Sequence, residues 1–398
     1  MLEIEQAPRH HEIYKAFEKE IIACSDFSTD ESLGRDVLGA NSFFAVLPEL
    51  IIDRDFRSIG QMANEAAERA QTLMSSEMSE EVARLAQRDL SMFVTSATIL
   101  TTKDPQIPPE AFEALPFATK ILVDLSRDLD IVPRTNDENF ADPRNPRRFS
   151  GEKTLVAGHS VPAEAFVKVI AGHSLRRQDE LVGGLMDVTQ VDVRSPEFID
   201  LLKRVRGDYS EFVSGVALFR TGLPLETFMK LVPNYAQIKI DGKTRSHSGS
   251  ENVTAHDFDY VMWSVDSSDP KFSQYRERHM DGATTKQKNA LATLSRNLEG
   301  TSLITKVTKS VPSDPRDATD EELERADVLF SAIGEMAAFR RTHRDAIERT
   351  LGEEYRPGNM SSGGDIKMAF ALQEETDLQL SRLRPFHEER LERTRIQV

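Results

Sequence analysis

Cysteine is almost absent from the sequence, which has only Cys24 among its 398 residues. A single thiol excludes intrachain disulfides and thiolate metal clusters. No apolar run approaches the roughly 20 residues that a membrane-spanning helix needs, and the N-terminus lacks the basic and apolar segments of a secretory signal. We therefore expect a cytoplasmic protein that has no membrane partner.

Positive charge is also scarce, since 50 basic residues stand against 66 acidic ones and give a net charge of −16. A surface this negative repels phosphate backbones, so we expect no nucleic-acid partner. The 39% hydrophobic and 29% charged content is ordinary for a folded globular protein. At roughly 150 residues per domain, the length favours two or three domains.

The motifs of several large enzyme classes are missing. The sequence contains no HExxH, CxxC, GxGxxG or GxSxG motif and no P-loop. It also lacks the alternation of strand and helix patterns that a parallel sheet requires. These absences argue against a dinucleotide-binding or P-loop enzyme.

What the sequence does have is helical periodicity, because apolar residues recur at three- and four-residue steps over most of its length. This pattern predicts an all-α fold. The expected helices cover 11–24, 58–76, 78–102, 118–130, 161–188, 195–221, 256–265, 283–299 and 319–355. One short hairpin is expected at Ile238–Ile240.

A polar, proline-containing stretch at 134–153 interrupts the helical pattern. Stretches of this kind are typical of linkers or long functional loops. We therefore predict a small N-terminal helical domain with its linker at 1–150 and a large helical domain at 151–398.

The most informative predicted helix covers 319–351. Thr319 and Glu322 have the spacing of a capping box at its start. One face then carries a stripe of residues at steps of three and four: Leu329, Ile333, Met336, Arg340, His343, Ile347 and Leu351. Arg340 and His343 are unusual on such a face, because a buried arginine is unfavourable unless it is paired and a buried imidazole needs hydrogen-bond partners.

Two interpretations of this pair stay open. In the first, His343 is a core histidine bonded to a backbone carbonyl, and Arg340 pairs with an acidic neighbour. In the second, His343 binds the iron of a haem and Arg340, one turn earlier, binds a haem propionate. The loop that follows contains Ser362, Gly363 and Gly364, which would let backbone approach a ligand closely or would simply form a turn.

These residues resemble a known superfamily. The segment Phe339-Arg340-Arg341-Thr342-His343, with Ser362-Gly363-Gly364 nineteen residues after the histidine, is similar to the C-terminal part of the indoleamine/tryptophan 2,3-dioxygenase superfamily. Residues 107–134 resemble the segment that closes its small domain. Further segments resemble the monodechloroaminopyrrolnitrin synthase family in particular: Asn145-Pro146, Phe149-Ser150-Gly151, Arg194 to Phe198, Ile238 to Gly242, and Trp263-Ser264 with Asp266 and Asp269.

The resemblance covers roughly 105–370 with gaps and implies an indoleamine 2,3-dioxygenase-like fold that holds haem b (iron protoporphyrin IX). His343 would be the metal ligand, and Arg340 would lie near a propionate. The Ser362, Gly363 and Gly364 loop would lie over the distal, substrate side, and Ser264 would line the haem edge. One departure limits the transfer of function, because Leu351 replaces a family tyrosine eight residues after the ligand. Covalent attachment of haem through a cysteine, as in one related branch, is not expected, because Cys24 is far from the ligand in sequence.

We expect a haem-dependent oxygenase that acts on an aromatic amino acid or indole-type substrate, with O2 or H2O2 as co-substrate, in specialised metabolism. Ser362 and His159 are the candidate catalytic groups. Arg147, Arg148 and Phe149, with Ser362, are candidates for binding a small aromatic substrate. For His159 a purely structural role is the alternative. For Arg147 and Arg148 the alternative is a solvated loop charge or a contact with a propionate. A haem-binding sensor or carrier without turnover, and a structural helical protein, are the competing functions, and a homodimer is possible in each case.

Overall fold

The computed structural model describes residues 37–38, 46, 50, 53–76, 78–103, 115–131, 133, 177–222, 238–240, 243–245, 253–280, 283–351 and 366–396. The chain divides into two compact units, which we call unit 1 (1–175 and 218–251) and unit 2 (176–217 and 252–398). This division differs from the predicted single boundary at residue 150, because the chain returns to unit 1 after residue 217 before it completes unit 2.

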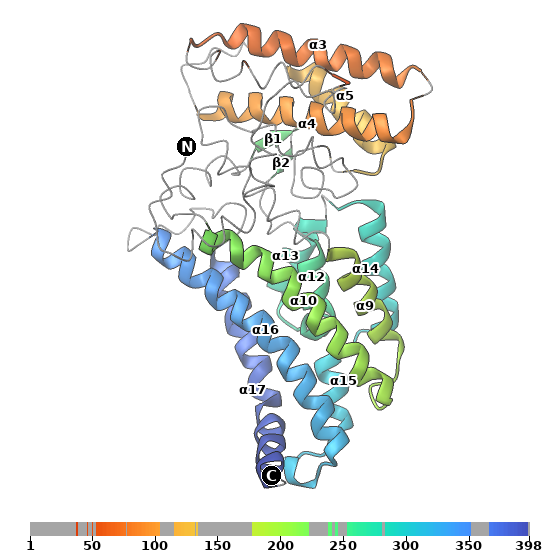
Figure 1. The fold of residues 1–398 in the computed structure, drawn as a ribbon, viewed down its shortest axis with the longest axis vertical. Coiled ribbons are helices and arrows are strands. Elements are labelled where there is room, and N and C mark those ends of the chain that lie inside the picture. Colours follow the sequence, from red (N-terminus) through yellow and green to blue (C-terminus); the bar gives the residue numbers. More distant parts are fainter. Residues whose placement is uncertain are drawn as a thin grey trace. The chain divides into compact units, whose positions relative to one another are not determined.

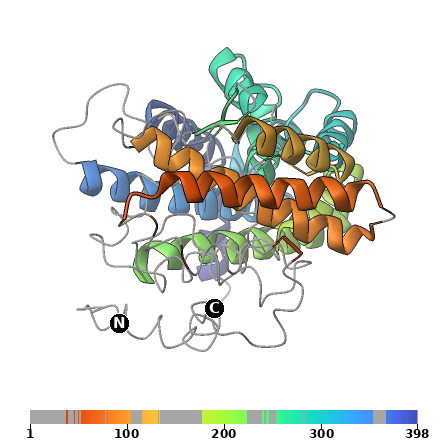
Figure 2. The same cartoon turned by 90° about the horizontal axis from the view of Figure 1, so that it is seen from above.

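The described part of unit 1 contains α3 (Phe56–Met74), α4 (Glu80–Lys103), α5 (Leu115–Asp128), β1 (Ile238–Ile240) and β2 (Lys243–Arg245). The three helices pack against one another, as Figures 1 and 2 both show. A row of alanines on α3, Ala63, Ala66, Ala67 and Ala70, is fully buried and permits this close approach.

The two strands form an antiparallel hairpin in which Ile238 pairs with Arg245 and Ile240 with Lys243. This confirms the hairpin that the sequence predicted. The dipeptide between the strands, Asp241-Gly242, is typical of two-residue hairpin loops. Apart from this hairpin the described residues form only helices, turns and loops, which confirms the all-α class.

Unit 2 is a set of helices around one apolar core. In chain order they are α9 (Gln178–Gln190), α10 (Pro196–Gly222), α12 (Val253–Asp259), the π-helix η5 (Tyr260–Ser264), α13 (Pro270–Met280), α14 (Thr285–Leu298), α15 (Leu303–Ser310), the 3-10 helix η6 (Pro315–Asp317), α16 (Asp320–Leu351) and α17 (Ile366–Ile396). None of the helices in the described ranges is long and apolar enough to cross a bilayer.

The long helices α16 and α17 pack side by side (Figure 1). Their contacts run antiparallel, because Asp327 of α16 contacts His387 and Arg390 of α17 while Arg341 contacts Asp377. Leu329, Ile333 and Met336 of the predicted stripe are fully buried in the core. This confirms the prediction that this face of α16 is buried, as far as Met336.

The capping box predicted at the start of α16 is present. The backbone N–H of Glu322 donates to Thr319 Oγ1 at 3.3 Å, and the Thr319 N–H donates to Glu322 Oε2 at 2.7 Å. Replacing Thr319 with alanine should therefore lower the free energy of unfolding by about 1 kcal/mol. Thr319→Ser, which keeps the hydroxyl, should match the wild type in the same urea titration. Equal stability of the alanine and serine variants would contradict the role of the cap.

Candidate functional site

The candidate site in unit 2 is built around a π-helical turn. The helix α12 continues directly into η5, where the N–H of Val265 donates to the carbonyl of Tyr260 at 3.2 Å. Turns of this kind are rare and occur frequently at functional sites. Phe258, Val261 and Met262 are fully buried, so the apolar core anchors this segment and fixes the direction of the polar side chains between them.

A largely buried ion pair joins this segment to α16. The guanidinium of Arg340 donates through Nη2 to Asp259, and each side chain is 11% exposed. Burial raises the pKa of Asp259, whereas Arg340, His256 and the indole of Trp263 oppose that rise. The pair is therefore taken out of water and depends on its own hydrogen bonds.

The helix α17 holds the other side of the same guanidinium. Arg340 Nη1 donates to the Leu372 carbonyl at 3.0 Å and also to the hydroxyl of Thr376. Thr376 is fully buried, and its hydroxyl donates to the same Leu372 carbonyl at 2.6 Å. Arg340 is thus held by acceptors on two helices, Asp259 on α12 and the Leu372 and Thr376 oxygens on α17.

A small recess borders the ion pair. It is lined by His256, Asp259, Trp263, Ser264, Phe272, Tyr275, Arg276 and Leu372. The Trp263 indole is 2% exposed and packs edge-on against Phe272, with ring centroids 5.0 Å apart. Its Nε1 is buried and interacts with Asp259, where it opposes the rise in the pKa of that carboxyl. Within the described ranges this contact falls short of a standard hydrogen bond. The recess has room for about one water molecule.

A second buried carboxylate, Asp257, lies two residues before Asp259. It is 2% exposed, and its Oδ1 has no hydrogen-bond partner among the residues described here. Burial raises the pKa of Asp257 to about 7, while Arg276 opposes the shift. Arg276 is itself held over the ring of Tyr260, with its Cζ 4.3 Å from the centroid. Near neutral pH Asp257 is therefore divided between its protonated and ionised forms.

The structure brings together only part of the predicted site. Arg340 is paired with Asp259, and Ser264 lines the recess that borders this pair. The backbone of His343 is described within α16, three residues after Arg340, but its side chain is not. The remaining predicted site residues lie outside the described part of the chain: Arg147, Arg148, Phe149, His159, Ser362, Gly363 and Gly364.

Arg340 has the acidic neighbour that the first interpretation of the sequence expected. Three of the roughly five N–H donors of its guanidinium are used by Asp259, Leu372 and Thr376. Sequence reasoning missed Asp257, Asp259 and Thr376. The first two carried a signal, since each is an acid directly beside large apolar residues in the run from Phe258 to Trp263.

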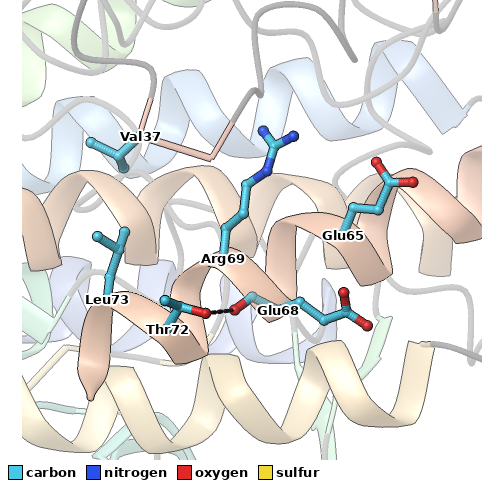
Figure 3. A pocket seen from close by; sticks show the side chains of 6 residues that line it. All are labelled: Val37, Glu65, Glu68, Arg69, Thr72 and Leu73. Atoms are coloured by element: carbon cyan, nitrogen blue, oxygen red, sulfur yellow. Dashed lines mark hydrogen bonds between the residues drawn. The ribbon is translucent and has the colours of Figure 1, made fainter. Parts of the chain in front are cut away.

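The rest of the described chain contains weaker candidates for a functional site. An open hollow of about 490 Å³ on unit 1 is lined by Val37, Glu65, Glu68, Arg69, Thr72 and Leu73 (Figure 3). Arg69 there already donates to the Leu38 carbonyl at 3.2 Å. No three His, Cys, Asp or Glu side chains in the described ranges gather closely enough to hold a metal ion.

No protein-family model matches the chain, and no curated protein is significantly similar to it.

Proposed function

We propose that the protein is a haem-dependent oxygenase that acts on an aromatic amino acid or an indole-type compound, with the fold of the indoleamine 2,3-dioxygenases. The observation that carries the proposal is the position of Arg340 on the continuous helix α16, just under one helical turn before His343. It adds to the sequence resemblance at Arg340, His343 and the Ser362–Gly364 loop. The partner of Arg340 in the structure is Asp259, which the structural interpretation of Arg340 also expects.

Of a haem, the donor groups around Arg340 could accommodate only a propionate group. A single histidine is enough to hold haem iron, so the absence of a three-ligand cluster in the described ranges does not count against it. Two N–H groups of Arg340 have no acceptor among the described residues. The indole of Trp263, whose ring centroid lies 5.9 Å from the guanidinium carbon, interacts with Asp259 without forming a standard hydrogen bond. These donors suit a propionate carboxylate. The recess is too small for a porphyrin, so a carboxylate oxygen is the largest part of haem that it would admit.

In this proposal His343 would hold the iron, Arg340 would bind a propionate and Ser264 would lie near the haem. The bound haem would supply the activation of O2 or H2O2. Ser362 and the Gly363–Gly364 backbone would orient the substrate and exclude water. Arg147 or Arg148 would bind a substrate carboxylate beside Phe149, and His159 would serve as an acid or base.

The first test is haem content. Purified protein should bind haem in a one-to-one ratio in a pyridine haemochrome assay, and a haem titration should quench the fluorescence of Trp263, the chain's single tryptophan. His343→Ala should abolish stable haem retention, whereas His387→Ala, on α17 beside Asp327, should not. A wild-type protein that takes up no haem would refute the proposal.

The second test is turnover. Tryptophan, tyrosine and their halogenated or N-modified derivatives should be incubated with the haem-loaded protein, air and a reductant, and the products identified by mass spectrometry. An oxidised product that His343→Ala does not form would support an oxygenase. Stoichiometric haem without any product would instead favour a carrier or sensor.

A further inference from the structure

Arg276 of α13 is a partly buried cation that lies on the face of an aromatic ring. Its Cζ is 4.3 Å from the ring centroid of Tyr260, and the guanidinium donates no hydrogen bond to any residue that the structure describes. Glu277, the next residue in sequence, is exposed to solvent. The hydroxyl of Tyr260 donates to Ser295 Oγ at 3.0 Å, so the ring is held independently of the arginine. A cation on a ring face is held only weakly, and Arg276 is therefore free to exchange this contact for a stronger one.

A buried carboxyl group lies beside the same ring. Asp257 comes three residues before Tyr260, where α12 continues into η5. Residues three apart are neighbours on one face of a helix, with Cβ atoms about 5–6 Å apart. Asp257 is 2% exposed, and its Oδ1 accepts no hydrogen bond from the described residues. A rotation of the flexible Arg276 stem would carry the guanidinium from the ring to this carboxyl.

Few other charges act on Asp257. The helix α12 packs against η5, α13 and α9. The residues that α9 buries are uncharged: Leu181, Gly184, Leu185, Val188 and Thr189. On α12 itself, His256 acts on Asp259, and Asp259 is already bound to Arg340 of α16. Among the described residues, Arg276 is therefore the cation that acts on Asp257.

We propose that Arg276 is a pH-dependent gate of the recess beside Trp263: it stays on the Tyr260 ring while Asp257 holds its proton, and it moves to Asp257 when that carboxyl releases the proton to solvent. A buried carboxylate needs a counter-charge and hydrogen-bond donors, and the guanidinium supplies both. Arg276 lines the recess whereas Asp257 does not, so the move takes the guanidinium out of the recess wall. Burial raises the pKa of Asp257 to about 7, which sets the exchange near or below neutral pH.

The test measures how readily acrylamide quenches the fluorescence of Trp263, the single tryptophan of the chain. Neither state of the gate involves haem, so the chain is used as purified, in buffers on both sides of neutral pH. Trp263 lines the same recess as Arg276, so its quenching constant should rise in one step as pH rises. Asp257→Asn cannot ionise, and Arg276→Met keeps a long stem without the charge, so both variants should lose the step. Glu277→Gln, which removes the exposed acid beside Arg276, is the matched control and should keep the step.

A wild-type quenching constant that does not change with pH would overturn the gate. A step that persists in Asp257→Asn would also overturn it, because another group at the recess, such as His256, would then be titrating. A step that persists in Arg276→Met, or one that disappears in Glu277→Gln, would show that the movement of Arg276 is not the cause. If Arg276→Met does not fold, Arg276→Gln takes its place. Each of these outcomes is independent of haem content and leaves the proposed function to its own test.

Discussion

Replacing Asp259 with alanine should lower the free energy of unfolding of unit 2 by about 3–5 kcal/mol. The substitution leaves Arg340, whose side chain is only 11% exposed, without its acidic partner. Removing one partner of a buried pair is strongly destabilising because the remaining charge has lost both water and its counter-charge. Since whole domains are stable by only about 5–15 kcal/mol, the change would bring unit 2 close to unfolding.

The chain provides its own probe for this measurement. Trp263 is the single tryptophan of the sequence, is 2% exposed and lies in the core of unit 2. Its fluorescence in a urea titration of the haem-free protein therefore reports the unfolding of unit 2. The double variant Asp259→Ala/Arg340→Leu should recover most of the lost stability, because no charge stays buried.

The neighbouring pair provides a matched control. Arg341 and Asp377 also join α16 to α17, but their side chains are 54% and 48% exposed. Asp377→Ala should change the free energy of unfolding by no more than about 1 kcal/mol. If Asp259→Ala has an effect as small as Asp377→Ala, the Arg340–Asp259 pair is not the buried interaction described here.

The elements that the sequence predicted well are those whose signal is local. The capping box of α16 depends on two residues three apart, and the stripe from Leu329 to Met336 depends on helical periodicity, so both could be predicted and both are present. The hairpin at Ile238–Ile240 is equally local.

Other elements had no such signal. The helix α17 was not predicted, because charged residues lie all round it and Pro385 lies inside it; contacts with α16 hold it in place. The shorter helices α13 and α15 were missed as well.

The partners of Arg340 could not be predicted from the sequence either, because Asp259 lies 81 residues before it and Thr376 lies 36 residues after it. Sequence periodicity marks a buried arginine as needing a partner but cannot name a partner so distant in the chain.

Replacing Asp257 with asparagine should stabilise unit 2 above neutral pH and have little effect near pH 4. Burial raises the pKa of the folded Asp257 to about 7 from an ordinary value of 3.8. Between these values the unfolded carboxyl has lost its proton while the folded one keeps it. The folded state therefore binds more protons, and the contribution of Asp257 to stability falls as pH rises through this window. At about 1.4 kcal/mol per pH unit the full loss is about 4 kcal/mol.

Asparagine cannot ionise, so Asp257→Asn should escape that loss. The difference in unfolding free energy between variant and wild type, followed by Trp263 fluorescence, should grow in favour of the variant from pH 4 to pH 8. Asp269→Asn is the control of opposite sign: hydrogen bonds from Lys271 lower the pKa of Asp269, so its carboxylate stabilises the folded state above its ordinary pKa and loses that contribution in acid. An Asp257→Asn difference that stays constant with pH would mean that this carboxyl titrates normally, and that it is not the desolvated acid that its burial implies.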